Sequence, residues 1–198
     1  MKTVALALAT LFTLSGCAAV KGADKPVTMR LSPAFAAGKP TASPTFSVAP
    51  VQARGVTGGL RYAYVDAAAP REIRQAATLF WEEPPPTVIA RAIVAGLRTR
   101  YAQVAGPELA LSADRRVVAV IDRFEEEVSG VDTRATVAFD VTQVSGGKAI
   151  WAGRYCVTRP IGAAAGSIRA EAFEAAIEAA VAALVQDIAT GSVTAADC

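Results

Sequence analysis

The sequence contains no histidine among its 198 residues. This absence excludes mechanisms that need an imidazole: Ser-His-Asp and Cys-His nucleophilic sites, acid–base catalysis by histidine, and the usual histidine-containing zinc or iron sites. Aromatic side chains are also scarce, at 7% of the chain, whereas 53% of the residues are hydrophobic. We therefore expect one globular domain whose core is filled largely by alanine, valine, leucine and isoleucine.

The sequence also has no large excess of positive or negative charge. The chain has 20 basic and 18 acidic side chains and a formal net charge of +2. Binding to nucleic acid needs a concentrated basic surface. Here the basic residues, such as Arg91, Arg98, Arg100, Arg115 and Arg116, are dispersed among acidic ones. The sequence therefore predicts no nucleic-acid partner.

Long hydrophobic runs are absent except at the N-terminus, where Val4 to Leu14 is apolar and follows Met1 and Lys2. As a helix this run would rise about 16 Å, too short for a bilayer core of about 30 Å. It has the length of the apolar part of a secretory signal. The next residues, Leu14-Ser15-Gly16-Cys17, resemble the lipobox of bacterial lipoproteins. An ordinary signal peptide with an incidental cysteine is the alternative.

The lipobox resemblance implies that residues 1–16 are removed and that Cys17 becomes the acylated first residue. Two or three acyl chains would hold the protein on a membrane essentially permanently, because each buried methylene contributes about 0.8 kcal/mol. Ala18 follows the cysteine, where an aspartate retains many bacterial lipoproteins in the inner membrane. By that analogy we expect the periplasmic face of the outer membrane.

Residues 17–44 are rich in alanine, glycine, proline and serine and show no sustained hydrophobic period. This composition is typical of a flexible tether. The sequence leaves open whether Met29 to Leu31 rest against the domain. We expect the domain itself to span residues 45–190, followed by a short tail over residues 191–198.

Periodicity predicts a mixed α/β fold: a largely antiparallel β-sheet packed by two main amphipathic helices. Alternating or continuous apolar runs predict strands at residues 45–51, 60–65, the end of 71–81, 117–124, 134–142 and 149–157, the last three forming a meander. Apolar residues at helical spacing predict helices over residues 87–104 and from Ser167, as the cap, to about residue 189.

The order of several motifs resembles the ABC-type transport auxiliary lipoprotein family. These motifs are the lipobox, Phe46-x-Val48-x-Pro50-Val51, Leu60-x-Tyr62-x-Tyr64-Val65 and Trp81-Glu82-Glu83-Pro84-Pro85, followed by a helix, a meander and a long last helix. The resemblance implies a non-catalytic component of an ABC system with a permease, an ATPase and an MCE-domain substrate-binding protein. It also implies a cargo of phospholipid or another lipid.

Tyr62, Tyr64, Trp81 and Pro85 mark the family motifs, and we consider them as partner contacts. The alternative is that they form core and turn structure, as an isolated tryptophan in a strand usually does. A scaffold in envelope assembly or envelope integrity, without lipid cargo, is the alternative function. Direct binding of an acyl chain in an alanine-lined groove is a subsidiary hypothesis.

No catalytic, cofactor or metal site is expected. Glu82-Glu83 and Glu125-Glu126-Glu127 supply carboxylates, but neighbours on a strand point to opposite faces, so we expect solvated charges. Gly146-Gly147-Lys148 has Thr142 where a phosphate-binding loop needs its first glycine. We interpret it as a hairpin turn and do not expect an enzyme.

Two cysteines remain if Cys17 is acylated. In an oxidising periplasm Cys156 and Cys198 are candidates for a disulfide. A buried free Cys156 with an unattached C-terminus is equally compatible with the sequence.

Overall fold

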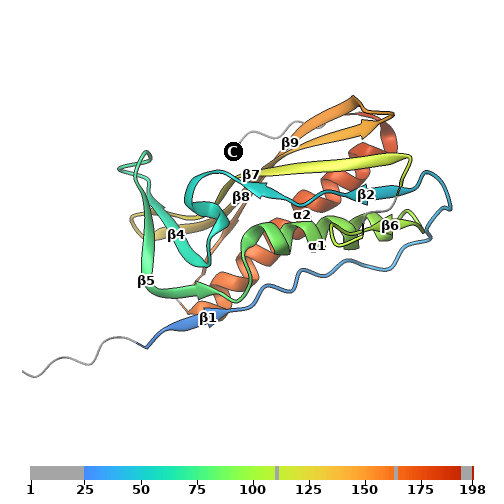
Figure 1. Cartoon of the computed structure of the whole chain (residues 1–198). Coiled ribbons are helices and arrows are strands. Elements are labelled where there is room, and N and C mark those ends of the chain that lie inside the picture. The colour runs from blue at the N-terminus through green and yellow to red at the C-terminus, as the bar shows by residue number, and fades with distance from the viewer. Residues whose placement is uncertain (1–24, 110–111, 163–164, 193–197) are drawn as a thin grey trace, which may run out of the picture.

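The computed structural model describes residues 25–109, 112–162, 165–192 and 198. The predicted signal peptide and the predicted acylation site at Cys17 lie outside these residues. A long meander forms the centre of the fold (Figure 1). It consists of β7 (Arg115–Ser129), β8 (Asp132–Ser145) and β9 (Lys148–Pro160), paired antiparallel in sequence order. The predicted meander is therefore confirmed, with strands longer than the apolar runs.

Shorter strands complete the sheet along the other edge of β7. The second half of β7 pairs parallel with β4 (Arg61–Asp66), which pairs antiparallel with β5 (Ile73–Trp81). The first half of β7 pairs parallel with β2 (Phe46–Val48) and then with β3 (Gln52–Ala53). Strand β6 (Val104–Ala105) pairs parallel with β2. A 3-10 helix, η1 (Gly55–Gly58), follows β3. The predicted mixed α/β single domain is thus confirmed.

Two helices pack against one face of this sheet: α1 (Pro85–Arg98) and α2 (Gly166–Thr190). The residues with helical spacing in α1, Ile89, Ile93 and Leu97, are fully buried. Gly96 brings the helices close together, because a Cβ at this position would overlap the side chain of Val181. The small residues of the two helices therefore allow a close helix–helix contact.

Two helix boundaries differ from the sequence prediction. The first helix ends at Arg98 rather than near residue 104, because Val104 pairs with Phe46 as a strand. The second helix has Ala165 as its N-cap and no capping hydrogen bond from a side chain, so the predicted cap at Ser167 was wrong. At its C-terminus Gly191 adopts a left-handed conformation, as a helix C-cap commonly requires.

Aromatic rings form the centre of the core at one end of the helices. The ring centroids of Trp81 and Phe173 are 5.0 Å apart, and those of Phe124 and Phe173 are 4.8 Å apart. Tyr62 lies 5.1 Å from Trp81. These contacts join β4, β5 and β7 to α2, so few aromatics suffice to connect four elements.

The expected flexible tether is contradicted for its described part, residues 25–44. Strand β1 (Val27–Met29) pairs with β5, and Met29 and Leu31 are buried. The backbone N–H groups of Ser32 and Ala34 donate to the carboxylates of Glu174 and Glu178 on α2, at 2.6 and 2.7 Å. The domain therefore begins near Val27 rather than at residue 45.

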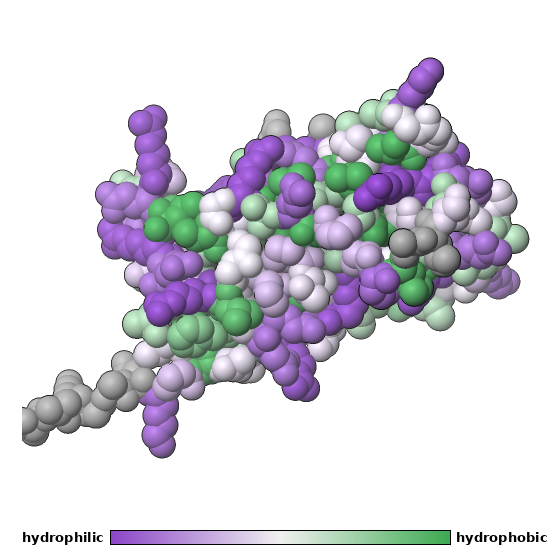
Figure 2. All heavy atoms as spheres, viewed as in Figure 1, coloured by the Kyte–Doolittle hydropathy of each residue, from purple (hydrophilic) through white to green (hydrophobic). Residues whose placement is uncertain are grey.

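This segment, residues 30–44, runs along the helices from one end of the molecule to the other (Figure 1). The sequence pattern is uninformative here because side chains of other elements provide its hydrogen bonds. Figure 2 shows several separate small hydrophobic areas on the face in view, divided by hydrophilic side chains. In the part of the chain that the structure describes, no helix is long and apolar enough to cross a membrane.

Candidate functional site on the first helix

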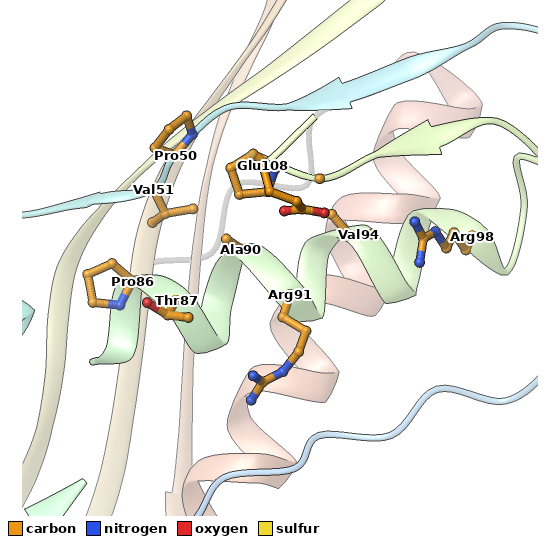
Figure 3. A pocket seen from close by; sticks show the side chains of 11 residues that line it. Pro50, Val51, Pro86, Thr87, Ala90, Arg91, Val94, Arg98 and Glu108 are labelled. Carbon is orange, nitrogen blue, oxygen red and sulfur yellow. The ribbon is translucent and has the colours of Figure 1, made fainter. Parts of the chain in front are cut away.

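A groove lies between α1 and the two loops that follow β2 and β6 (Figure 3). Its volume is about 390 Å³. The lining residues come from three segments that are distant in sequence: Pro50 and Val51; Pro86, Thr87, Ala90, Arg91, Val94 and Arg98; and Gly106, Pro107 and Glu108.

The local sequence explains why the space is open. Pro50 lies in the break between β2 and β3, because a proline cannot donate a hydrogen bond to β7. Pro85 and Pro86 begin α1, where a missing N–H has no cost. The floor is formed by short side chains, those of Val51, Ala90 and Val94, all of which are buried. Small residues on three converging segments thus leave an elongated apolar trough.

Three charged side chains line the groove: Arg91, Arg98 and Glu108, the last with its carboxylate beside Val94 (Figure 3). The guanidinium of Arg98 donates to the carbonyl of Val104 at 3.0 Å. Arg91 forms an ion pair with Glu83 at 2.5 Å and donates to the carbonyl of Leu31, so its guanidinium points away from the floor (Figure 3). The groove can therefore accept an elongated apolar group with a polar end near the rim, such as an acyl chain.

Three of the four predicted partner contacts are part of the interior. Tyr62 is 1% exposed and Trp81 is 3% exposed, and Pro85 is buried at the start of α1. Tyr64 alone is half-buried. Direct contact of Tyr62, Trp81 or Pro85 with a partner disagrees with this burial, and the alternative of core and turn structure agrees with it. The motif thus marks the fold rather than an exposed surface.

The prediction that the Glu125–Glu127 carboxylates are solvated was wrong for two of the three. Glu125 and Glu126 are buried. The Tyr62 hydroxyl donates to Glu126, and Arg169 of α2 forms an ion pair with the same carboxylate at 2.8 Å. Burial, and then the hydrogen bond to Glu126, raises the pKa of Tyr62 well above its ordinary value. This cluster joins β4, β7 and α2 inside the core.

A second buried pair lies further along α2. The Tyr155 hydroxyl donates to Asp187 at 3.0 Å. Burial, and then this hydrogen bond, raises the pKa of Tyr155 above its ordinary value. The pair connects β9 to α2, so both buried acidic groups on the helix face of the sheet have structural partners.

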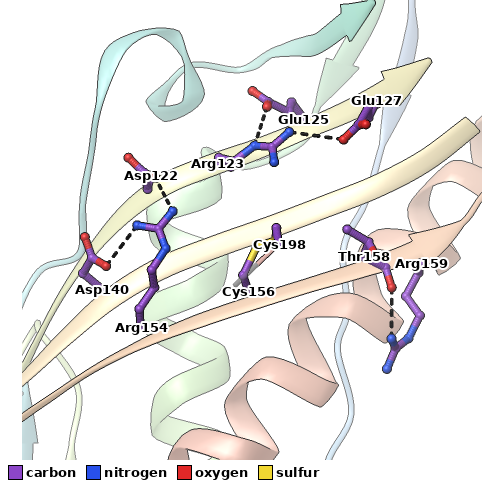
Figure 4. The surroundings of a disulfide bond; sticks show 10 residues. All are labelled: Asp122, Arg123, Glu125, Glu127, Asp140, Arg154, Cys156, Thr158, Arg159 and Cys198. Carbon is purple, nitrogen blue, oxygen red and sulfur yellow. Dashed lines mark hydrogen bonds and ion pairs between the residues drawn. A yellow bond between two sulfur atoms is a disulfide. The ribbon is translucent and has the colours of Figure 1, made fainter. Parts of the chain in front are cut away.

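The opposite face of the sheet carries the disulfide and an ion-pair network (Figure 4). Cys156 of β9 is joined to Cys198, with the Cα atoms 5.4 Å apart, which corresponds to the paired alternative. Nearby, Arg154 bonds Asp122 at 2.6 Å and Asp140 at 3.3 Å. Among the described residues no group of three or more His, Cys, Asp or Glu side chains is suited to hold a metal ion.

The model of the family described as "ABC-type transport auxiliary lipoprotein component" matches residues 30–189. The chain belongs to this family. The match begins at Arg30, inside the segment that the sequence pattern assigned to a tether. A search of curated proteins gives no match.

Solved structures share the fold of this auxiliary lipoprotein. Protein XCC0632 from Xanthomonas campestris, of the family DUF330, is 19% identical, with a TM-score of 0.72 over 83% of this chain and 96% of that chain. An uncharacterized protein is 12% identical, with a TM-score of 0.63 over 82% and 99%. The hypothetical protein CT253 from Chlamydia trachomatis is 12% identical, with a TM-score of 0.51 over 75% and 99%.

Sequence reasoning missed the groove itself. Its residues lie in three separate segments, and none belongs to a recognised motif apart from Pro50 and Val51. The available signal was a proline within each lining segment, at Pro50, Pro86 and Pro107. Prolines interrupt backbone pairing, but only the tertiary structure shows that the three interruptions converge.

Proposed function

We propose that this auxiliary lipoprotein serves an ABC system that moves phospholipid or another lipid and whose substrate-binding protein carries an MCE domain. We propose further that acylated Cys17 anchors it to the periplasmic face of the outer membrane. The observation that carries the proposal is the family match over residues 30–189, together with the lipobox at Cys17. The expected permease and ATPase complete this set of partners.

Within this function the groove on α1 holds an acyl chain. Its floor is apolar, its volume of about 390 Å³ suits a single chain, and Arg98 lies at its rim. An acyl chain gains about 0.8 kcal/mol for each methylene removed from water. A groove open along one side would hold a lipid long enough for transfer without trapping it.

The role we propose is not catalytic. The buried titratable groups that often mark an active site are held here by structural partners: Glu126 by Tyr62 and Arg169, and Asp187 by Tyr155. These groups lie on the core side of the sheet rather than in the groove. The chemistry of transport therefore belongs to the ATPase partner.

Affinity purification of the full-length lipidated protein from a crosslinked envelope tests the partners. We expect an MCE-domain protein, a permease and an ATPase to be recovered, and less of all three with Cys17→Ala. Recovery of only outer-membrane assembly or peptidoglycan-associated proteins would instead favour the scaffold function. Adjacent genes for the three partners would be a rapid independent check.

Native mass spectrometry tests the groove. We expect bound phospholipid on the wild-type protein and a loss of at least tenfold with Thr87→Trp, because Thr87 is exposed at the groove and an indole would fill it. Glu171→Trp is the matched control, since Glu171 is exposed on α2 outside the groove. Equal lipid on both variants would contradict the assignment of the groove.

A further inference from the structure

Positive charge gathers at the end of the molecule where α1 and α2 terminate. We call this the distal basic surface; its members are Lys39, Arg98, Arg100, Arg115, Arg116 and Lys148. All are exposed except Arg115, which is half-buried. Figure 2 shows hydrophilic side chains over this end of the face in view, among smaller hydrophobic areas. The small net charge of the whole chain conceals this concentration.

Strand register and shared clefts bring the six residues together. Lys39 and Arg100 line one cleft, beside the end of α2. Arg115 is the Cα partner of Phe46, and its guanidinium lies 6.0 Å from the centroid of that ring. Arg116 pairs with Val144, next to the hairpin that carries Lys148. Arg115 and Arg116 are neighbours on β7 and point to opposite faces of the sheet. The surface therefore wraps around this end of the molecule, from the N-terminal segment to the turn between β8 and β9.

None of these six cations forms an ion pair with a carboxylate in the described part of the chain. Elsewhere seven arginines do so. The exposed acidic groups described at this end are Glu108 and Asp114; Asp187, near the end of α2, is buried. Asp114 accepts hydrogen bonds from the N–H and hydroxyl of Thr45, and the backbone bond lowers its pKa. Positive charge exceeds negative charge here by three to one.

This surface lies far from the anchored end. Helix α2 begins against Val27 and Met29, near the start of the described chain, and ends where Trp151 donates to the carbonyl of Ser192. Its 25 residues span about 37 Å. This length is several times the Debye length of about 8–10 Å in physiological salt. On the proposed function, on which this step rests, Cys17 anchors the opposite end of the domain; with α2 directed away from the membrane, the cations lie beyond electrostatic reach of its headgroups.

We infer that the distal basic surface docks an acidic face of a periplasmic protein. The six cations lie on separate segments and do not converge on one point, so they match an extended anionic surface better than a single phosphate. Their distance from the anchoring membrane favours a protein partner. Clustered charge of this kind accelerates association by about 10 to 1,000-fold at low salt and makes it strongly salt-dependent.

The test places the full lipidated protein in neutral phosphatidylcholine vesicles and adds fluorescent poly-L-glutamate as the acidic polypeptide. We expect binding at 50 mM salt that weakens at least tenfold at 500 mM. Lys39→Glu/Arg116→Glu/Lys148→Glu removes three exposed cations that have no bonding partner among the described residues, so the fold is retained; circular dichroism checks this. Its association rate should fall at least tenfold.

The matched control is Lys25→Glu/Arg71→Glu/Arg134→Glu, which changes the net charge equally but at the anchored end. We expect less than a twofold effect. An equal loss with both triple variants would attribute binding to net charge and overturn the inference. Addition of anionic phosphatidylglycerol vesicles gives the third outcome: clustering of vesicles that the distal variant abolishes would identify a membrane surface and also overturn it.

Discussion

The buried carboxylate of Glu126 gives the most specific stability prediction. Its side chain is 6% exposed, that of Arg169 is 17% exposed, and the two are 2.8 Å apart. Glu126→Ala would leave the guanidinium without this carboxylate and remove the acceptor of the Tyr62 hydroxyl. Breaking a buried pair from one side costs about 3–5 kcal/mol, so we expect a loss of that size in the free energy of unfolding.

Urea unfolding followed by circular dichroism measures this loss. With a urea slope of about 2 kcal/mol per molar, the midpoint should fall by about 2 M at unchanged slope. Glu72→Ala is the matched control, because its ion pair with Arg74 is exposed, and we expect no measurable shift. Glu126→Ala/Arg169→Ala should recover part of the loss. Equal midpoints for Glu126→Ala and Glu72→Ala would show that the buried pair does not stabilise the fold.

Three further predictions concern packing, the disulfide and acid stability. Gly96→Val should lower the free energy of unfolding by about 1–3 kcal/mol, measured by urea unfolding, because the added side chain meets Val181; an unchanged midpoint would show that the helices are not in close contact. Cys198→Ser removes a disulfide that joins residues 42 positions apart and should lower the free energy of unfolding by up to about 4 kcal/mol. Thiol counting on the unreduced wild-type protein should find neither Cys156 nor Cys198 free. The hydrogen bond from Arg154 lowers the pKa of Asp122, so the ionised carboxylate stabilises the fold above pH ~4, and this stabilisation is lost as pH falls through the lower pKa of the folded state. Asp122→Asn should therefore lower the free energy of unfolding by less than about 1 kcal/mol at pH 7 and leave it unchanged once the wild-type carboxyl is protonated. A difference in stability that does not depend on pH would contradict this.

The long elements could be predicted because their own sequences contain the signal. Strand β8 alternates Ala135, Val137, Phe139 and Val141 on the core face, and the α1 residues Ile89, Ile93 and Leu97 repeat every fourth position. Burial of one face requires this pattern in any long strand or helix. The meander and both helices followed directly from it.

The ordered path of the N-terminal segment could not be predicted, because its own sequence contains no periodic signal. Its order depends on carboxylates of α2, which lie about 140 positions away in the sequence, at Glu174 and Glu178. An extended segment held by such bonds needs no hydrophobic period of its own. The acidic stripe of α2 was visible in the sequence, but the backbone groups that it binds were not.

The burial of Glu125 and Glu126 was missed for a related reason. Three consecutive glutamates favour a solvated surface in any single-sequence interpretation. Here β7 passes between η1, β4 and α2, and the cations that compensate the two carboxylates, Arg123 and Arg169, lie on the same strand and on the distant helix. Arg123 lies two positions from Glu125 on the same strand, but the partner of Glu126 is on another element and can be identified only when the tertiary structure is known.

Phospholipid transfer between the membranes of intact cells measures the proposed transport function itself. Cells lacking this auxiliary lipoprotein receive the wild type, Cys17→Ala, Thr87→Trp or Glu171→Trp, and the movement of radiolabelled phospholipid between inner and outer membranes is followed over time. We expect slowed transfer without the protein, full restoration by the wild type and Glu171→Trp, and poor restoration by Cys17→Ala and Thr87→Trp. Equal transfer rates with and without the protein would contradict the proposed function.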